Sequence, residues 1–154
     1  MRVSYIADYS VCCEELYELA DCSAACTHNH PEGVKGAMVT AESSLMALIG
    51  RPKEDIRKVL LKNYGEEIKL NERRPTCHYD VTCWGSVPLA IQCFLESDSY
   101  ESCLRNVLSV ECDTDTVAAI AGSIAGGFYK KFPCDVDTLL REKLDSRLYQ
   151  LYVS

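Results

Sequence analysis

Apolar residues recur every three or four positions along most of the chain, which is the spacing of helices that bury one face. The pattern predicts helices over residues 11–26, 34–49, 52–64, 87–94, 100–108, 117–128 and 136–153. Their inward faces are expected to include Leu16, Ala41, Ile56, Val59, Leu60, Val87, Ile91, Phe94, Cys103, Leu104, Val107, Leu108, Val117, Ile120, Ile124 and Leu140.

Start and stop signals agree with these segments. Gly65 follows a periodic run and Pro52 opens one, as expected for glycine beyond a helix end and proline near a helix start. Serine is a preferred N-cap, so we expect Ser10, Ser86 and Ser99 to cap the helices that follow them.

The remaining pattern completes a single all-α domain over residues 1–154. Residues 66–84 show no long period and are expected to form a loop, with a short extended piece near 78–84. Gly122 and Gly126 lower helix propensity, so we expect them to permit close contact between helices.

Composition excludes two classes of partner. The chain carries a net charge of −7 and no Lys/Arg cluster, whereas nucleic-acid-binding domains normally show a basic stripe. No apolar stretch approaches the roughly 20 residues of a membrane span, and the N-terminus lacks the apolar run of a signal peptide. The ten cysteines form no CxxC pair. We therefore expect mostly free thiols in a reducing, cytoplasmic compartment, with no nucleic acid and no membrane as partner.

Carboxylates and hydroxyls alternate just before the glycine-rich helix. Asp113, Asp115 and Thr116 offer hard oxygen ligands within four positions, which suit Mg²⁺, Mn²⁺ or Ca²⁺. Asp and Thr are also preferred N-caps, and acids in a first turn complement the helix dipole. Spacing alone favours the cap, because a hard cation takes about six oxygen ligands and these three residues are too few to supply them.

Two cysteines and two histidines around a polar loop are of the ligand types that bind zinc: Cys22, Cys26, His28 and His30. Their spacing differs from that of zinc fingers, so zinc is not expected. The simplest interpretation is a solvated loop in which Thr27 or Asn29 caps the next helix. The alternative is that His28 hydrogen-bonds a substrate.

Trp84 and Gly85 precede an expected helix start. A glycine there allows close backbone approach, and free N–H groups at a helix start favour an anion. A tight turn in which Trp84 covers the core explains the same residues and is the favoured interpretation.

These stretches occur in the same order in a known family. The matching segments are "MRVS" at 1–4, "SAACTHNHPEGVKGAMVTAESSLMAL" at 23–48, "CWGSVPLAIQCFLES" at 83–97 and "RNVLSVECDTDTVAAIAGSIAGGFY" at 105–129. Over nearly its whole length the chain resembles the C-terminal portion of the ADP-ribosylglycohydrolases. That group includes dinitrogenase reductase-activating glycohydrolase and the ADP-ribosylarginine and ADP-ribosylserine hydrolases.

The resemblance implies an all-α, orthogonal helical bundle around a binuclear Mg²⁺ or Mn²⁺ centre. It implies hydrolysis of the glycosidic bond between ADP-ribose and a protein side chain. His28 corresponds to the histidine of the family's TH motif near the substrate, Gly85 is expected to line the pocket, and Ser4 ends a segment beside the adenosine side. The implied metal ligands are Asp113, Asp115 and Thr116.

The chain also departs from the family pattern. Relatives are longer at the N-terminus, where they carry further helices with an Asp-rich metal motif and the phosphate-binding loop. Met1 corresponds to an internal methionine of those relatives. Glu111 and Cys112 replace the usual Gly-Gly, and Tyr5 replaces a frequent proline.

These departures give two expectations for function. The first is an ADP-ribosylglycohydrolase that is weak or inactive alone and needs a complementing chain, with ADP-ribose or an ADP-ribosylated protein as ligand. The second is a non-catalytic ADP-ribose-binding or structural relative. Helix faces left exposed by the missing portion also predict self-association into a homo-oligomer.

Overall fold

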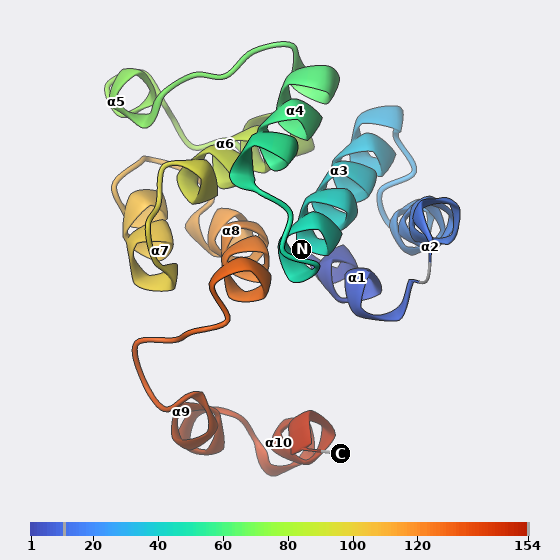
Figure 1. The fold of residues 1–154 in the computed structure, drawn as a ribbon, viewed down its shortest axis with the longest axis vertical. Coiled ribbons are helices and arrows are strands. Elements are labelled where there is room, and N and C mark those ends of the chain that lie inside the picture. The colour runs from blue at the N-terminus through green and yellow to red at the C-terminus, as the bar shows by residue number, and fades with distance from the viewer. Residues whose placement is uncertain (11, 154) are drawn as a thin grey trace.

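The computed structural model describes residues 1–10 and 12–153, and the regular structure of this part of the chain is helical (Figure 1). The expected all-α fold is therefore confirmed. No described residue belongs to a strand. Of the extended piece expected near 78–84, Thr82 has extended backbone angles, whereas residues 83–84 already belong to α6. The elements are η1 (Arg2–Tyr5), α1 (Ile6–Tyr9), α2 (Cys13–Ala25), α3 (Pro31–Leu48), α4 (Lys53–Tyr64), α5 (Leu70–Arg73), α6 (Cys83–Leu95), α7 (Tyr100–Leu108), α8 (Thr114–Tyr129), α9 (Val136–Lys143) and α10 (Ser146–Val153).

Two expected boundaries are confirmed. The Ser99 hydroxyl accepts a hydrogen bond from the Ser102 N–H (3.1 Å), and the Ser102 hydroxyl accepts one from the Ser99 N–H (3.0 Å), which forms a capping box at α7. Gly65 ends α4 with φ 81°, a left-handed conformation that glycine adopts without steric cost.

Two expected caps are wrong. The N-cap of α6 is Thr82, whose hydroxyl accepts a hydrogen bond from the Gly85 N–H (3.1 Å), and Ser86 is buried inside the helix. Ser10 ends α1, where its hydroxyl donates to the Ile6 carbonyl (2.9 Å), and it does not cap α2. Position 11, the first of the expected 11–26 helix, lies outside the described residues.

α3 is the central helix and packs against α2, α4, α6 and α8. Gly127 permits a close approach of α8 to α3, because a Cβ there would lie 3.3 Å from the Leu48 nitrogen. Gly122 and Gly126 face α7 and the chain after α8 at ordinary contact distances. Leu108, expected to face inward, is 72% exposed. The largest fully buried side chains include Leu16, Ile56, Leu60, Leu89, Ile91, Phe94, Val107, Val117 and Ile124.

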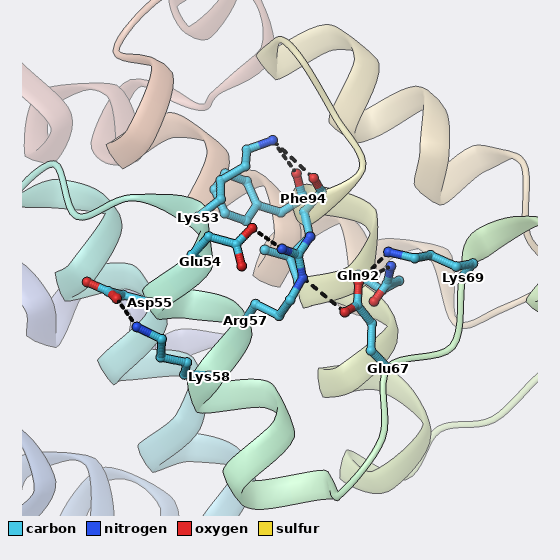
Figure 2. Close-up of polar contacts among 10 residues, drawn as sticks. Lys53, Glu54, Asp55, Arg57, Lys58, Glu67, Lys69, Gln92 and Phe94 are labelled. Carbon is cyan, nitrogen blue, oxygen red and sulfur yellow. Dashed lines mark hydrogen bonds and ion pairs between the residues drawn. The ribbon is translucent and has the colours of Figure 1, made fainter.

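Polar contacts join α4 and the loop after it to α6 (Figure 2). Arg57 pairs with Glu67 (Nε to Oε2 2.9 Å), and the Gln92 amide donates to Glu67 (3.3 Å) and Glu96 (2.6 Å). The Lys53 amine donates to backbone carbonyls at the end of α6. These contacts fix the C-terminal end of α6, while its N-terminal end reaches the cavity described below.

The expected helix over 136–153 is two helices. The Asp145 carboxylate accepts hydrogen bonds from the N–H groups of Arg147 (2.9 Å) and Leu148 (3.0 Å), which begins a new helix. α9 and α10 lie beyond the C-terminal end of α8 and pack mainly on each other (Figure 1). The loop expected over 66–84 also contains a short helix, α5.

The ten cysteines are free thiols, and five of them are exposed. Cys93 and Cys103 are fully buried in the core. Burial raises the pKa of Cys103 to about 11 and also raises the pKa of Cys93. Within the described ranges, no helix has the length and apolar character needed to cross a membrane.

Candidate functional site

A cavity of about 630 Å³ lies where the first turns of α3, α6 and α8 meet the N-terminal segment. His28, which precedes α3, lines it together with Asp113 and Thr116 at the start of α8. Val87 and Ile120 contribute apolar wall. The fold therefore brings three of the expected site residues, far apart in sequence, to one cavity.

Asp113 occupies the N-cap position of α8, but its carboxylate makes no capping hydrogen bond. The first turn is closed by the backbone, since the Val117 N–H donates to the Asp113 carbonyl (2.9 Å). The side chain is half-buried and lines the cavity. Spacing favoured a side-chain cap, and for Asp113 that prediction is wrong.

Asp115 lies in the first turn of α8, exposed and outside the cavity lining. A hydrogen bond with the Asp113 carboxyl is the main cause that lowers the pKa of Asp115, and the backbone N–H groups of Thr116 and Asp115 lower it further. The oxygens of these two carboxyl groups are hard ligands, of the type that a divalent cation prefers.

His28 is held by contacts to the N-terminal segment. The Arg2 guanidinium donates to the Thr27 hydroxyl oxygen, and that oxygen lies 2.8 Å from His28 Nδ1. Arginine can only donate, so the Thr27 hydroxyl proton is available to Nδ1. When Nδ1 accepts that proton, the ring proton of His28 lies on Nε2.

The loop around His28 is set by the ends of two helices. The N–H groups of Thr27 (3.0 Å) and His28 (2.7 Å) both donate to the Ala24 carbonyl at the end of α2. His30 caps α3, because its Nδ1 accepts a hydrogen bond from the Glu32 N–H (3.2 Å). The expectation that a side chain at position 27 or 29 caps this helix is wrong.

Comparison of the sequence with models of protein families identifies the family of this chain. The model of the ADP-ribosylglycohydrolase family matches residues 1–152 of the 154. The chain belongs to this family. No curated protein matches it. The resemblance inferred from the sequence is therefore confirmed.

Ser4 and Gly85, two further residues that the ADP-ribosylglycohydrolase resemblance implied, lie outside the lining of this cavity. The Ser4 hydroxyl donates to the Met1 carbonyl (3.1 Å) and lines a separate groove beside α1. Gly85 packs against Asp80, whose carboxylate leaves no room for a Cβ, and lines a smaller cavity of about 160 Å³ that also contains Cys112.

Sequence reasoning missed several polar residues of the cavity in this ADP-ribosylglycohydrolase chain: Arg2, Thr40, Thr82, Cys83 and Ser86. One signal was available for Thr82: threonine is a preferred N-cap, and Thr82 stands three positions before Gly85, whose N–H it accepts. Arg2 had no local signal, because its partner Thr27 is 25 positions away.

The oxygen ligands at this site are of the type that a divalent cation prefers, but they are too few to complete its coordination shell. Asp113, Asp115 and Thr116 supply hard oxygens. Among the residues that the structure describes, no three His, Cys, Asp or Glu side chains are grouped to hold a metal ion, and this includes the potential zinc ligands of residues 22–30. Mg²⁺ or Mn²⁺ takes about six oxygens, so water, substrate or another chain must supply the others.

Gly33 positions the His28 loop against α3. A Cβ at Gly33 would lie 2.7 Å from the His28 carbonyl oxygen, which is a backbone atom that cannot move alone. We expect Gly33→Ala to lower the free energy of unfolding by about 1 kcal/mol, because overpacking exceeds the gain in helix propensity. Urea unfolding measures this change.

The matched control is Gly122→Ala in α8. A Cβ there would meet its nearest neighbour, the Tyr100 hydroxyl, at 3.4 Å, an ordinary contact. This substitution is expected to raise the free energy of unfolding by up to about 1 kcal/mol. Equal stabilisation by both substitutions would contradict the close packing of Gly33 on His28.

Proposed function

We propose that the cavity binds the ADP-ribose unit of an ADP-ribosylated protein, beside a Mg²⁺ or Mn²⁺ ion held by Asp113, Asp115 and Thr116. The chain then acts as an ADP-ribosylglycohydrolase whose turnover is slow when it is alone. The observation that carries this proposal is the meeting of His28, Asp113 and Thr116 in one cavity, in a chain that belongs to this family.

The size and electrostatics of the cavity support an elongated anionic ligand. Its volume of about 630 Å³ falls within the range of cofactor-sized sites, roughly 300 to 1,000 Å³. Gly33, Cys83 and Thr116 line it from the first turns of three long helices. The positive dipole ends of these helices favour phosphate oxygens, which a diphosphate supplies.

Each proposed site residue has a chemical role in this proposal. The carboxylates of Asp113 and Asp115 and the Thr116 hydroxyl hold the cation, which, when bound, polarises oxygen ligands as a Lewis acid. His28 presents Nε2–H as a hydrogen-bond donor, because its Nδ1 is engaged by Thr27. Val87 and Ile120 exclude water from one side of the cavity.

The second candidate function is non-catalytic ADP-ribose binding. It is favoured by the lack of a third clustered acid or histidine in the described part of the chain. A cation held by so few protein ligands is mostly hydrated and binds weakly. We therefore expect binding of ADP-ribose with slow hydrolysis, unless a complementing chain supplies further ligands.

We further propose a cytoplasmic setting. Ten free cysteines, five of them exposed, are compatible with a reducing compartment.

Isothermal titration calorimetry of the purified chain tests this function, with Mn²⁺ first and then ADP-ribose. Binding of both supports the proposal, and binding of neither overturns it. Parallel assays on ADP-ribosylarginine and ADP-ribosylserine peptides separate hydrolase from binding module. Release of ADP-ribose that requires Mn²⁺ supports catalysis, whereas tight binding with no release supports the second candidate.

A further inference from the structure

The Lys35 ammonium group on α3 contacts two aromatic rings and a carboxylate. Its nitrogen lies 4.9 Å from the centre of the Tyr64 ring and 4.8 Å from the Trp84 ring. The two rings meet edge-on, with their centres 5.5 Å apart and their planes inclined by 65°. The oxygens of Glu32, three positions earlier on α3, lie 2.8 and 3.0 Å from the same nitrogen. We refer to Tyr64, Trp84 and Glu32 as the cation cage.

This arrangement has the chemistry of a site for a positively charged side chain. The face of an aromatic ring attracts a cation within about 6 Å of its centre, and cages of aromatic residues recognise quaternary ammonium groups. The Glu32 carboxylate adds a charge-assisted hydrogen bond, which lysine and arginine can both donate. The chain's own ammonium group in this place therefore shows which class of group the cage accepts.

Lys35 occupies the cage without being buried in it. The Lys35 side chain is 28% exposed and that of Glu32 is 43% exposed, so solvent screens their ion pair, which contributes little stability. Trp84 is 54% exposed, whereas Tyr64 is buried. Lys35 also lines a cavity of about 660 Å³ between α2, α3 and α4, which gives its side chain room to move. A cation from another molecule can therefore take its place.

The cage adjoins the proposed ADP-ribose cavity. Gly36 and Cys83 line that cavity, and they are the sequence neighbours of Lys35 and Trp84. Gly36 lets the N-terminal parts of α3 and α6 approach closely, because a Cβ there would lie 3.1 Å from the Cβ of Cys83. A protein that carries the bound ADP-ribose would therefore present its surface close to the cage.

Charge favours a basic group as the occupant. The chain has 23 acidic and 16 basic residues, a net charge of −7, so its field attracts a positively charged segment of a partner. The Glu32 carboxylate within the cage repels an acidic segment at close range. Net charge and local charge therefore agree on the class of partner.

We propose that the cage binds a lysine or arginine side chain of the ADP-ribosylated partner protein, and that this side chain displaces Lys35 into solvent. The identity of the partner rests on the proposed function, whereas the cation site itself does not. In the free chain, Lys35 covers the rings until a basic group replaces it. The residues that flank the ADP-ribosylated one are then a determinant of specificity.

The fluorescence of Trp84, the single tryptophan of the chain, tests the cation site. The probe is tetramethylammonium chloride, and Lys35→Ala removes the competing ammonium group from the cage. A saturable change in emission is expected from Lys35→Ala, at a concentration roughly tenfold or more below that needed for the wild-type chain. Adding Glu32→Gln should raise this concentration roughly tenfold. A response no greater than that to sodium chloride at equal ionic strength overturns the proposal.

Calorimetry with two ADP-ribosylserine peptides tests the partner. The peptides differ only beside the modified serine, where one carries arginine and the other glutamate. The wild-type chain is expected to bind the arginine peptide roughly tenfold more tightly. Glu32→Gln should remove most of this preference and leave the affinity for free ADP-ribose unchanged. The control Glu101→Gln, which removes an acid paired with Arg105 on α7, should keep the preference.

The outcomes separate this inference from the proposed function. Equal affinity for the two peptides, or an equal loss of preference in Glu32→Gln and Glu101→Gln, overturns the assignment of the partner. Absence of binding by free ADP-ribose contradicts the proposed function instead. The cation site is then still decided by the tetramethylammonium titration, which needs neither ADP-ribose nor Mn²⁺.

Discussion

Replacing Lys53 with methionine is expected to lower the free energy of unfolding by about 3 kcal/mol, because hydrogen bonds from a charged donor contribute about 1.5–3 kcal/mol each. The Lys53 amine donates to the carbonyl of Phe94 (3.0 Å) at the end of α6 (Figure 2). It also donates to the carbonyls of Leu95 (3.2 Å) and Ser97. The amine also lies 4.9 Å from the centre of the Phe94 ring.

The expected loss of stability is large because of where the Lys53 ammonium group lies. A positive charge at a helix C-terminus complements the helix dipole, and carbonyls that lose their donor stay partly desolvated. Methionine retains the apolar stem of Lys53, so lost packing contributes little. The same end of α6 is fixed by Tyr129, whose hydroxyl donates to the Ser97 carbonyl (2.9 Å).

Lys58→Met is the matched control on the same helix. The Lys58 side chain is 75% exposed and forms an ion pair with Asp55 (2.9 Å). Exposed pairs contribute at most about 1 kcal/mol, so the control should lose far less stability than Lys53→Met. Urea unfolding of both variants provides the comparison, and equal losses would show that the amine of Lys53 does not support α6.

Helix positions were predictable because each depends on a local, repeated pattern. Ser99 and Gly65 marked true ends, since their signals involve neighbours three to five positions away. Thr82 and Ser86 both satisfied the rule for a cap, and only packing distinguishes them, because Ser86 is buried among α6 contacts. Asp145 carried a valid start signal that the leucine periodicity on both sides concealed.

The site was predictable only in part. Resemblance named His28, Asp113 and Thr116, and the fold brings them to one cavity. The contact of Arg2 with Thr27 depends on tertiary packing, so spacing could not reveal it. The sequence could not show that the Asp113 side chain does not cap α8, because a cap and a ligand have the same sequence signal.

Asp113→Asn and Asp115→Asn are each expected to weaken Mn²⁺ binding by roughly 100-fold or more, because each removes a charged oxygen ligand from a set that is already small. Asparagine keeps the side-chain volume, and α8 should still form, since neither its N-cap nor its first turn depends on a side-chain bond from Asp113. Calorimetry with Mn²⁺ measures the loss directly.

The two variants should differ in their effect on ADP-ribose. Asp113 lines the cavity and Asp115 does not, so Asp113→Asn alters direct contacts with the ligand, whereas Asp115→Asn acts through the cation. Without Mn²⁺, only Asp113→Asn is expected to change the affinity for ADP-ribose. Asp21→Asn, an exposed acid on α2, is the control and should leave both affinities unchanged. Retention of wild-type Mn²⁺ affinity by both variants would show that these carboxylates do not hold the cation.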